Sequence, residues 1–330
     1  MLPEGSELSS LDASALESSP TEARNPHTED IDDLPPLALL ERINDEDATV
    51  PSAVRAVLPV LADLVEETVQ RLRTGGRVHY FGAGTSGRLG LLDAAEIPPT
   101  YGLPKGIFIG HIVGGEDAFS AALEGGEDDD EQGENEARAA VEPGDVVIGL
   151  AASGYTPYVR GALRAARSIG ARTALVTSNP QAPLAALADI FLCAETGPEV
   201  VTGSTRMKSG SAQKLVLNAF STAVMIRSGR TWSNLMVDMV PSNAKLQARF
   251  SRMLAEATGE DEATCLEALD RAEGDPKATV VMLRAGVDAG AATWALAERG
   301  RSVRAALALL ATDEAIDRAG DGAVDGSGRS

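Results

Sequence analysis

The chain has 330 residues, of which 44% are hydrophobic and only 4% aromatic, so we expect one large aliphatic core with an accessory unit. Its formal net charge of −20 at pH 7 argues against nucleic acid and anionic membrane as partners, because both require a basic surface. Two cysteines and three histidines without metal-type spacing, and no secretory leader, predict a cytoplasmic protein without a metal site.

The N-terminal region divides into a tail and two helices. Residues 1–20 are rich in Ser, Glu and Pro, which predicts a disordered acidic tail. From Leu34 onward, the apolar spacing predicts one short helix and one long amphipathic helix that ends at Gly75-Gly76. We expect an α/β domain that includes these helices to span residues 21–256.

The segment RVHYFGAGTSGRLGLLDAAEIPPT, residues 77–100, joins an apolar run to a small-residue loop and a helical pattern. Val78 to Phe81 suit a buried strand, and the glycines that follow let the backbone turn tightly and approach a ligand. A helix that begins near Gly87 points its free N–H groups at this loop. We therefore predict an anion site there, with Thr85 and Ser86 as hydroxyl donors.

A second loop of the same kind follows about seventy residues later in DVVIGLAASGYTPYVRGALRAA. A strand over residues 145–150 precedes a loop over residues 151–156, and Pro157 is a favoured first helical residue. Two such loops predict one phosphate that is held from two sides. Neither loop has the Gly-Lys-Ser/Thr ending of a nucleoside-triphosphate site, so a compact sugar phosphate is favoured.

The first loop also matches G-x-G-x-x-G, through Gly82, Gly84 and Gly87. That dinucleotide pattern requires an acidic residue about 20 positions later, but the next predicted strand ends in His111, Ile112 and Val113. We therefore expect no nicotinamide or flavin cofactor. A glycine-rich turn that merely reverses the chain is the other interpretation, and the recurrence of the pattern weakens it.

Apolar β-type runs alternate with helical patterns through the middle of the chain. The runs are residues 78–81, 107–113, 146–150, 173–177 and 190–193. This alternation predicts an α/β fold with a doubly wound parallel sheet. Ligands bind beyond the carboxyl ends of the strands in such sheets, which is where both small-residue loops fall.

The last third of the chain has helical patterns. A polar run, Thr202 to Lys208, precedes an apolar helix over Gln213 to Ile226. Residues 257–318 predict a small helical C-terminal unit, because they contain several short amphipathic segments. Residues 319–330 are rich in Gly, Asp and Ser and predict a loose tail.

Seven stretches of the chain carry a family resemblance. They are TEARNPHTEDID, INDEDATVPSAV, GAGTSGRLGLLDAAEIPPTYG, GGEDAFSAALEGGEDD, ASGYTPYVRGAL, EVVTGSTRMKSGSAQKLVLN and NLMVDMVPSN. Together they resemble the N-acetylmuramic acid 6-phosphate etherases, over about Thr21 to Arg304. The resemblance implies a sugar isomerase domain fold, N-acetylmuramic acid 6-phosphate as substrate, no cofactor, and a homodimer with its active site near the subunit interface.

The resemblance also implies a reaction, the cleavage of the D-lactyl ether at C3 to give N-acetylglucosamine 6-phosphate and D-lactate. The open-chain aldehyde makes the C2 proton acidic, so a base removes it, an acid helps lactate leave, and water then adds at C3. The family's catalytic pair falls on Glu96, in DAAEIPP, and on Glu127, in GGEDD. We expect Glu96 to be the acid, because a helix C-terminus disfavours negative charge, and Glu127 to be the base.

Substrate and phosphate contacts are expected from the two loops and from the later polar run. The predicted residues are Thr85, Ser86, Gly87, Ser153, Gly154, Thr156, Ser204 and Thr205. Without the resemblance, Glu96 would be interpreted as a solvated helix end and Glu127 as part of an exposed acidic run. Two alternative functions fit the same pattern: an aldose-ketose sugar-phosphate isomerase, and a non-catalytic sugar-phosphate-binding regulator similar to the glucokinase regulatory protein.

Overall fold

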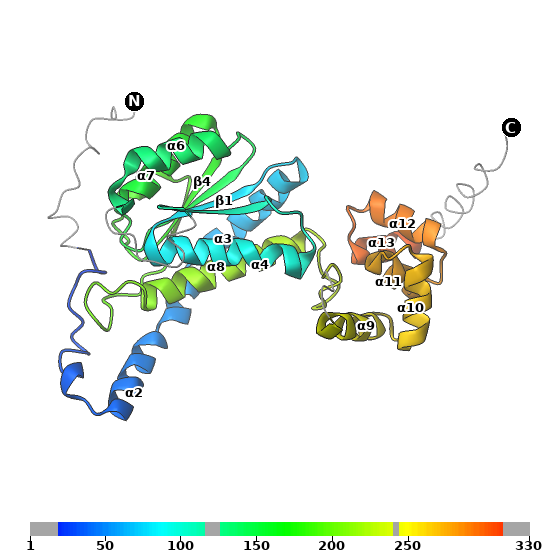
Figure 1. Ribbon diagram of the computed structural model, residues 1–330, viewed down its shortest axis with the longest axis horizontal. Coiled ribbons are helices and arrows are strands. Elements are labelled where there is room, and N and C mark those ends of the chain that lie inside the picture. The colour runs from blue at the N-terminus through cyan, green and yellow to red at the C-terminus, as the bar shows by residue number, and fades with distance from the viewer. Residues whose placement is uncertain (1–18, 116–125, 240–243, 313–330) are drawn as a thin grey trace. The chain divides into compact units, whose positions relative to one another are not determined.

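The computed structural model describes residues 19–115, 126–239 and 244–312 (Figure 1). Its internal contacts divide the chain into two units. We call Met1–Ala95 with Lys105–Ser221 the sheet unit, and Glu96–Pro104 with Thr222–Ser330 the helical unit. Most of the predicted acidic tail and all of the predicted C-terminal tail lie outside the described residues. Ser19 is described, and it is buried with its hydroxyl 2.9 Å from that of Thr21.

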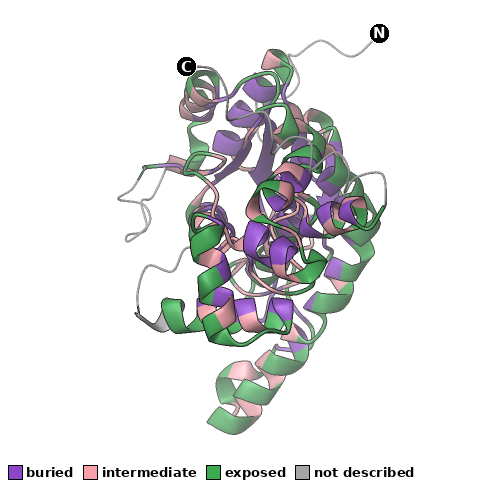
Figure 2. Ribbon diagram, turned by 90° about the vertical axis from the view of Figure 1, so that its right-hand side faces the viewer, coloured by how far each residue is buried: buried purple, intermediate pink, exposed green. Residues whose placement is uncertain are grey.

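Five parallel strands form one sheet in the order β2-β1-β3-β4-β5. They are β1 (Val78–Gly82), β2 (Phe108–Ile112), β3 (Val146–Leu150), β4 (Arg172–Thr177) and β5 (Ile190–Cys193). All residues of β1 and β3 are buried, as the purple strands of Figure 2 show. This confirms the five strands that the apolar runs predict.

Strand β1 lies between β2 and β3. Val78 pairs with Phe108 on one side and with Val146 on the other. The chain therefore passes from β1 to β2 at one edge of the sheet, and then crosses to the opposite side of β1 to form β3. Open parallel sheets form a crevice beyond the carboxyl ends of the strands at such a switch point.

Helices α6 (Asp130–Ala140) and α7 (Pro157–Ile169) cover one face of the sheet (Figure 1). Phe81 and Leu175 of the sheet pack there against Tyr158 of α7. All three of these side chains are fully buried. This apolar layer accounts for the near-continuous apolar sequence of the strands.

Helices α3 (Val50–Arg73), α4 (Gly84–Tyr101) and α8 (Lys208–Arg227) lie on the other face (Figure 1). Gly90 of α4 approaches Tyr80 and Leu150 so closely that a Cβ there would lie 2.9 Å from the Cβ of Tyr80. Both faces of the parallel sheet are thus covered by helices, which confirms the doubly wound fold.

The glycines of α6 and α7 let these two helices touch through their backbones. A Cβ on Gly133 would overlap the carbonyl oxygen of Tyr158, and one on Gly161 would overlap that of Asp130. We expect Gly133→Ala to lower the free energy of unfolding by about 3 kcal/mol, because the helices must separate. Gly144→Ala is the control, since its Cβ would meet no atom closer than 3.9 Å. Equal losses for both variants in urea denaturation would contradict this explanation.

The N-terminal helices α2 (Pro36–Asp47) and α3 confirm the predicted short and long helices. The stretch Pro36–Arg73 is long and apolar enough to cross a membrane by length and composition alone, a test that core helices of soluble proteins also pass. Val50, Val54, Val57 and Leu61 of α3 are buried at spacings of three or four residues. That stripe is typical of an amphipathic helix packed on a core.

Within residues 244–312, the helical unit contains five helices with a core of their own. They are α9 (Ala244–Thr258), α10 (Glu262–Arg271), α11 (Pro276–Ala285), α12 (Ala289–Glu298) and α13 (Val303–Leu310). Asp261, Asp275, Asp288 and Ser302 cap the last four by accepting backbone N–H bonds. Contacts group residues 222–256 with these helices, whereas the sequence prediction begins the helical unit at residue 257.

Candidate functional site

A cavity of about 440 Å³ lies in the sheet unit, beyond the carboxyl ends of the strands. Its lining comes from residues 83–86 after β1, residues 127–128 after β2, and residues 152–153 and 155–157 after β3. Glu22 from the N-terminal segment and Thr205 before α8 complete it. The switch point of the sheet therefore carries a concave site large enough for a small molecule.

Most of the predicted site residues meet at this cavity. Its lining includes Thr85, Ser86, Ser153, Thr156, Thr205 and Glu127. Ser204 and the two predicted glycines do not line it, and Glu96 belongs to the helical unit. Residues more than a hundred positions apart in the sequence thus come together through the parallel sheet.

The two glycines shape the backbone around the cavity. A Cβ on Gly87 would lie 2.5 Å from the carbonyl oxygen of Gly82 and 2.6 Å from Cγ1 of Ile112, so Gly87 lets α4 pack on the strand ends. Gly154 has φ +75° and no room for a Cβ beside Ala182. Both positions therefore require glycine for the loops to adopt this conformation.

Helix α4 begins at Gly84, three residues earlier than predicted. Gly84 has φ +51°, a left-handed conformation that turns the chain into the helix directly after β1. The N–H groups of the first helical turn have no partner within the helix, and Thr85 and Ser86 of that turn line the cavity. The positive end of the helix dipole therefore lies at this site.

Helix α7 begins at Pro157, as predicted, and its N-terminus also meets the cavity. The Thr156 side chain caps no backbone N–H of the helix, so its hydroxyl can serve a ligand. Asn179 holds the loop from β4 by donating to the carbonyl oxygen of Ser153 at 2.8 Å. Two helix N-termini thus face one cavity.

The N-terminus of α8 is already occupied by a protein carboxylate. Glu199 is fully buried and accepts the backbone N–H groups of Lys208 and Ser209, both at 2.9 Å. The polar run before α8 therefore has no helix N-terminus to offer an anion. Only Thr205 of this run lines the cavity, and the Ser204 N–H donates to the carbonyl oxygen of Val201 at 2.9 Å.

The cavity is rich in hydroxyls and carboxylates. The charged residues among its described lining are Glu22, Glu127 and Asp128, with no lysine or arginine. An anion bound there would depend on backbone N–H groups and hydroxyls for its stabilisation. Across residues 19–115, 126–239 and 244–312, no three His, Cys, Asp or Glu side chains gather to hold a metal ion.

The acidic run around Glu127 divides into separate structural roles. Asp129 caps α6 by accepting the Gln132 N–H at 2.8 Å, and Asp130 pairs with Arg160 at 2.7 Å. Glu127 is exposed in a short 3-10 helix, Gly126–Asp128, and lines the cavity. Asp129 and Asp130 therefore have structural roles, while Glu127 and Asp128 line the site.

Glu96 is exposed on α4. The sequence pattern predicts that Glu96 lies at the C-terminal end of the helix, but α4 continues through Pro98 and Pro99 to Tyr101. Glu96 lies five residues before that end, and the helix dipole acts mainly within the last turn. The helix dipole therefore favours the protonated form of Glu96 less than the sequence pattern predicts.

A buried carboxylate that no sequence pattern predicted fixes α4. Asp93 accepts hydrogen bonds from Tyr80 at 2.9 Å, Asn218 at 2.8 Å and Ser221 at 3.0 Å. Burial raises the pKa of Asp93 above its ordinary range, and these three donors offset part of that effect. The network ties α4 to β1 and α8.

Glu22 and Tyr155 also line the cavity, and neither was predicted as a site residue. Glu22 lies in TEARNPHTEDID, one of the stretches that carry the family resemblance. This family resemblance is the sequence signal that could have identified Glu22 as a site residue. No local pattern links an N-terminal glutamate to loops that follow it by more than sixty residues.

The segment with Glu22 is anchored by buried polar groups. Asn25 donates to Glu46 at 2.8 Å and to the carbonyl oxygen of Pro198 at 3.3 Å. Glu46 also pairs with the buried Lys208 at 2.6 Å. Burial alone would raise the pKa of Glu46, but hydrogen bonds from Lys208, His27 and Asn25 outweigh it and lower the pKa to about 2.

We expect Lys208→Met to lower the free energy of unfolding by about 3 kcal/mol at pH 7, because it leaves the buried Glu46 carboxylate without its cation. Since folding lowers the pKa of Glu46 from 4.5 to about 2, its contribution is complete above pH 4.5 and is lost as the pH falls toward 2. The difference between variant and wild type should therefore shrink on acidification. Urea denaturation at pH 7 and pH 4 measures it, with the exposed Lys105→Met as control.

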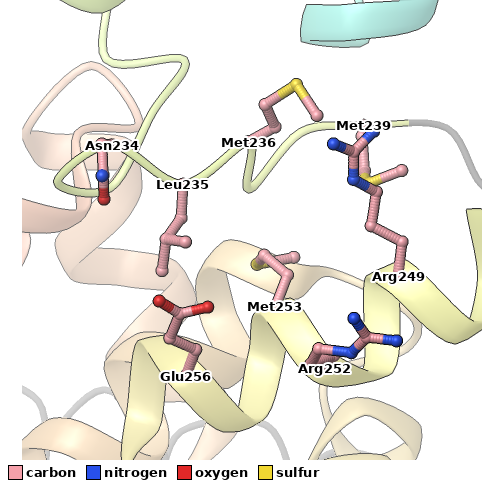
Figure 3. A pocket seen from close by; sticks show the side chains of 8 residues that line it. All are labelled: Asn234, Leu235, Met236, Met239, Arg249, Arg252, Met253 and Glu256. Atoms are coloured by element: carbon pink, nitrogen blue, oxygen red, sulfur yellow. The ribbon is translucent and has the colours of Figure 1, made fainter.

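A second cavity, of about 270 Å³, lies in the helical unit and has a different character (Figure 3). Apolar side chains form much of its wall, with Arg249 and Arg252 toward one end and Glu256 toward the other. None of the predicted site residues lines it. The cavity at the strand ends is therefore the candidate active site.

Two family models match the chain. One is described as the N-terminal SIS domain of glucokinase regulatory protein and matches residues 60–167, and the other is the SIS domain, over residues 128–223. Together with the doubly wound parallel sheet and the cavity at its switch point, these matches define a sugar isomerase domain protein.

Relatives over most of the length give a narrower assignment. An N-acetylmuramic acid 6-phosphate etherase from Thermobifida fusca is 57% identical, over 80% of this chain and 86% of the relative. Relatives of the same name from Symbiobacterium thermophilum (51%; 81% and 89% covered) and Pectobacterium atrosepticum (48%; 87% and 95% covered) also match. The chain belongs to the N-acetylmuramic acid 6-phosphate etherase family.

Proposed function

We infer that this protein is a carbon-oxygen lyase that cleaves the D-lactyl ether of N-acetylmuramic acid 6-phosphate, giving N-acetylglucosamine 6-phosphate and D-lactate. The observation that carries this inference is the 57% identity, over 80% of the chain, to a relative named for the reaction. The cavity supports it, because two helix N-termini and a carboxylate share one site. Two free cysteines suit a reducing, cytoplasmic location.

We propose that the phosphate binds between the N-termini of α4 and α7. Thr85 and Ser86 lie in the first turn of α4, and Ser153 and Thr156 belong to the loop that leads into α7. All four line the cavity. Their hydroxyls and the free backbone N–H groups compensate the dianion where the lining holds no cation.

Glu127 is the proposed base and Glu96 the proposed acid. The Glu127 carboxylate takes the C2 proton of the open-chain sugar, the C2–C3 double bond forms, and the C3–O bond breaks. The Glu96 carboxyl gives its proton to the departing lactate oxygen. Water then adds at C3 and loses a proton to Glu96, while Glu127 returns a proton to C2.

The length of α4 supports a homodimer that shares the site. Glu96 follows Gly84 by twelve residues, or about 18 Å of helix rise, so one copy of α4 does not bring both its N-terminus and Glu96 to the same small ligand. We propose that a second copy of the chain supplies Glu96. The symmetric pair would then have two sites, each with residues from both chains.

D-lactate release from N-acetylmuramic acid 6-phosphate in water enriched in heavy oxygen tests the proposed function. We expect lactate together with label at C3 of N-acetylglucosamine 6-phosphate, because water replaces the lost ether oxygen. Lactate without label in the sugar would contradict elimination followed by hydration.

A binding regulator is the second candidate, because one matching family model takes its description from glucokinase regulatory protein. A regulator would bind the intact substrate tightly and release no lactate. An aldose-ketose isomerase would also release none, but it would convert a sugar phosphate into its keto isomer.

A further inference from the structure

Glu22 lines the cavity, and the N-terminal segment that carries it is anchored both before and after this residue. Its backbone N–H donates to the carbonyl oxygen of Ser19 at 3.0 Å. Thr21 is fully buried and Asn25 is 4% exposed, and Asn25 is tied to Glu46 as described above. The backbone around Glu22 is therefore fixed, while its half-buried side chain lines the cavity.

The Glu22 carboxylate lies beside the loop that carries Thr205. A Cβ placed on Gly203 would be 3.3 Å from Oε2 of Glu22. Among the described residues, the Thr21 hydroxyl donates to the Glu22 carboxylate over a long distance of 3.4 Å. An ionised carboxylate can accept about four hydrogen bonds, so the Glu22 carboxylate can also accept hydrogen bonds from a ligand.

The charges of the cavity determine which part of a bound ligand lies beside Glu22. The two helix N-termini attract a phosphate, whereas a carboxylate repels a dianion and accepts hydrogen bonds from hydroxyl or amide groups. A bound sugar phosphate therefore lies most favourably with its phosphate at the helix N-termini and its hydroxyl-bearing body toward Glu22.

We propose that Glu22 is a substrate-contacting residue that accepts hydrogen bonds from the sugar body and so determines how the sugar phosphate is oriented. This inference rests on the proposed function, since it assumes a sugar phosphate in this cavity. Glu22 adds a third carboxylate to a reaction for which the family resemblance supplies two.

Binding of two probes tests the proposal, N-acetylglucosamine 6-phosphate and inorganic phosphate, both by calorimetry. We expect Glu22→Ala to weaken binding of the sugar phosphate about tenfold, because hydrogen bonds to a charged acceptor are lost. Inorganic phosphate should bind unchanged or more tightly, because the change removes a repulsive charge. Glu22→Gln, which keeps one carbonyl acceptor, should fall between Glu22→Ala and wild type.

Glu29→Gln is the matched control, because Glu29 is exposed on the same N-terminal segment and does not line the cavity. Unchanged affinity for the sugar phosphate in Glu22→Ala would overturn the proposal. So would an equal loss for both probes, which would indicate a disturbed cavity. Lactate release is measured separately: the expected binding pattern without lactate release would leave the role of Glu22 intact and refute the etherase function.

Discussion

Glu127→Gln is expected to lower the rate of D-lactate release roughly a thousandfold, because the amide cannot take the C2 proton. Affinity for N-acetylglucosamine 6-phosphate should remain close to that of wild type, since Gln has the same shape and the proposed phosphate contacts are intact. Single-turnover kinetics and calorimetry measure the two effects. A variant with near-normal turnover would exclude Glu127 as the base.

Two neighbouring substitutions make this result specific. Asp128→Asn changes the other carboxylate of this short helix that lines the cavity, and we expect a much smaller loss of activity. Asp129→Asn changes the α6 cap, so stability is affected more than turnover. If Asp128→Asn instead caused the larger loss, Asp128 would be the base.

Exchange of the C2 hydrogen with solvent distinguishes the catalytic base from the catalytic acid. In heavy water, an enzyme with an intact base incorporates deuterium at C2 of N-acetylglucosamine 6-phosphate without breaking an ether bond. Glu127→Gln should lose this exchange, and Glu96→Gln should keep it. The opposite pattern would reverse the two assignments.

Glu96→Gln is expected to lower lactate release at least a hundredfold, because the departing lactate oxygen no longer receives a proton. If the second chain supplies Glu96, mixing this variant with Glu127→Gln should restore activity. Random exchange of subunits makes half of the dimers mixed, each with one intact site of two, so we expect about a quarter of wild-type activity.

The control for subunit exchange is a mixture of Glu127→Gln with Glu127→Ala, which contains no intact base and should stay inactive. Differently tagged chains, recovered together, verify that exchange has occurred. No recovery in a verified mixture of Glu96→Gln and Glu127→Gln would mean that both glutamates of a site come from one chain.

The sequence by itself determined the fold class and the two small-residue loops. Buried parallel strands require continuous apolar runs, and tight turns into helices require glycine or proline, so Val146–Leu150 and Pro157 can be identified from local pattern. The order of strands and loops then places both loops at one edge of a parallel sheet.

Features that depend on the path of the chain were decided only by the tertiary structure. The Glu46–Lys208 pair joins residues 162 positions apart, and Glu22 reaches loops that no local pattern connects to it. Adjacent acidic residues likewise received different roles: Asp129 caps a helix and Glu127 lines the cavity. The physical reason is that local propensity and periodicity act over a few residues, whereas burial, ion pairing and exposure depend on which distant segments pack together.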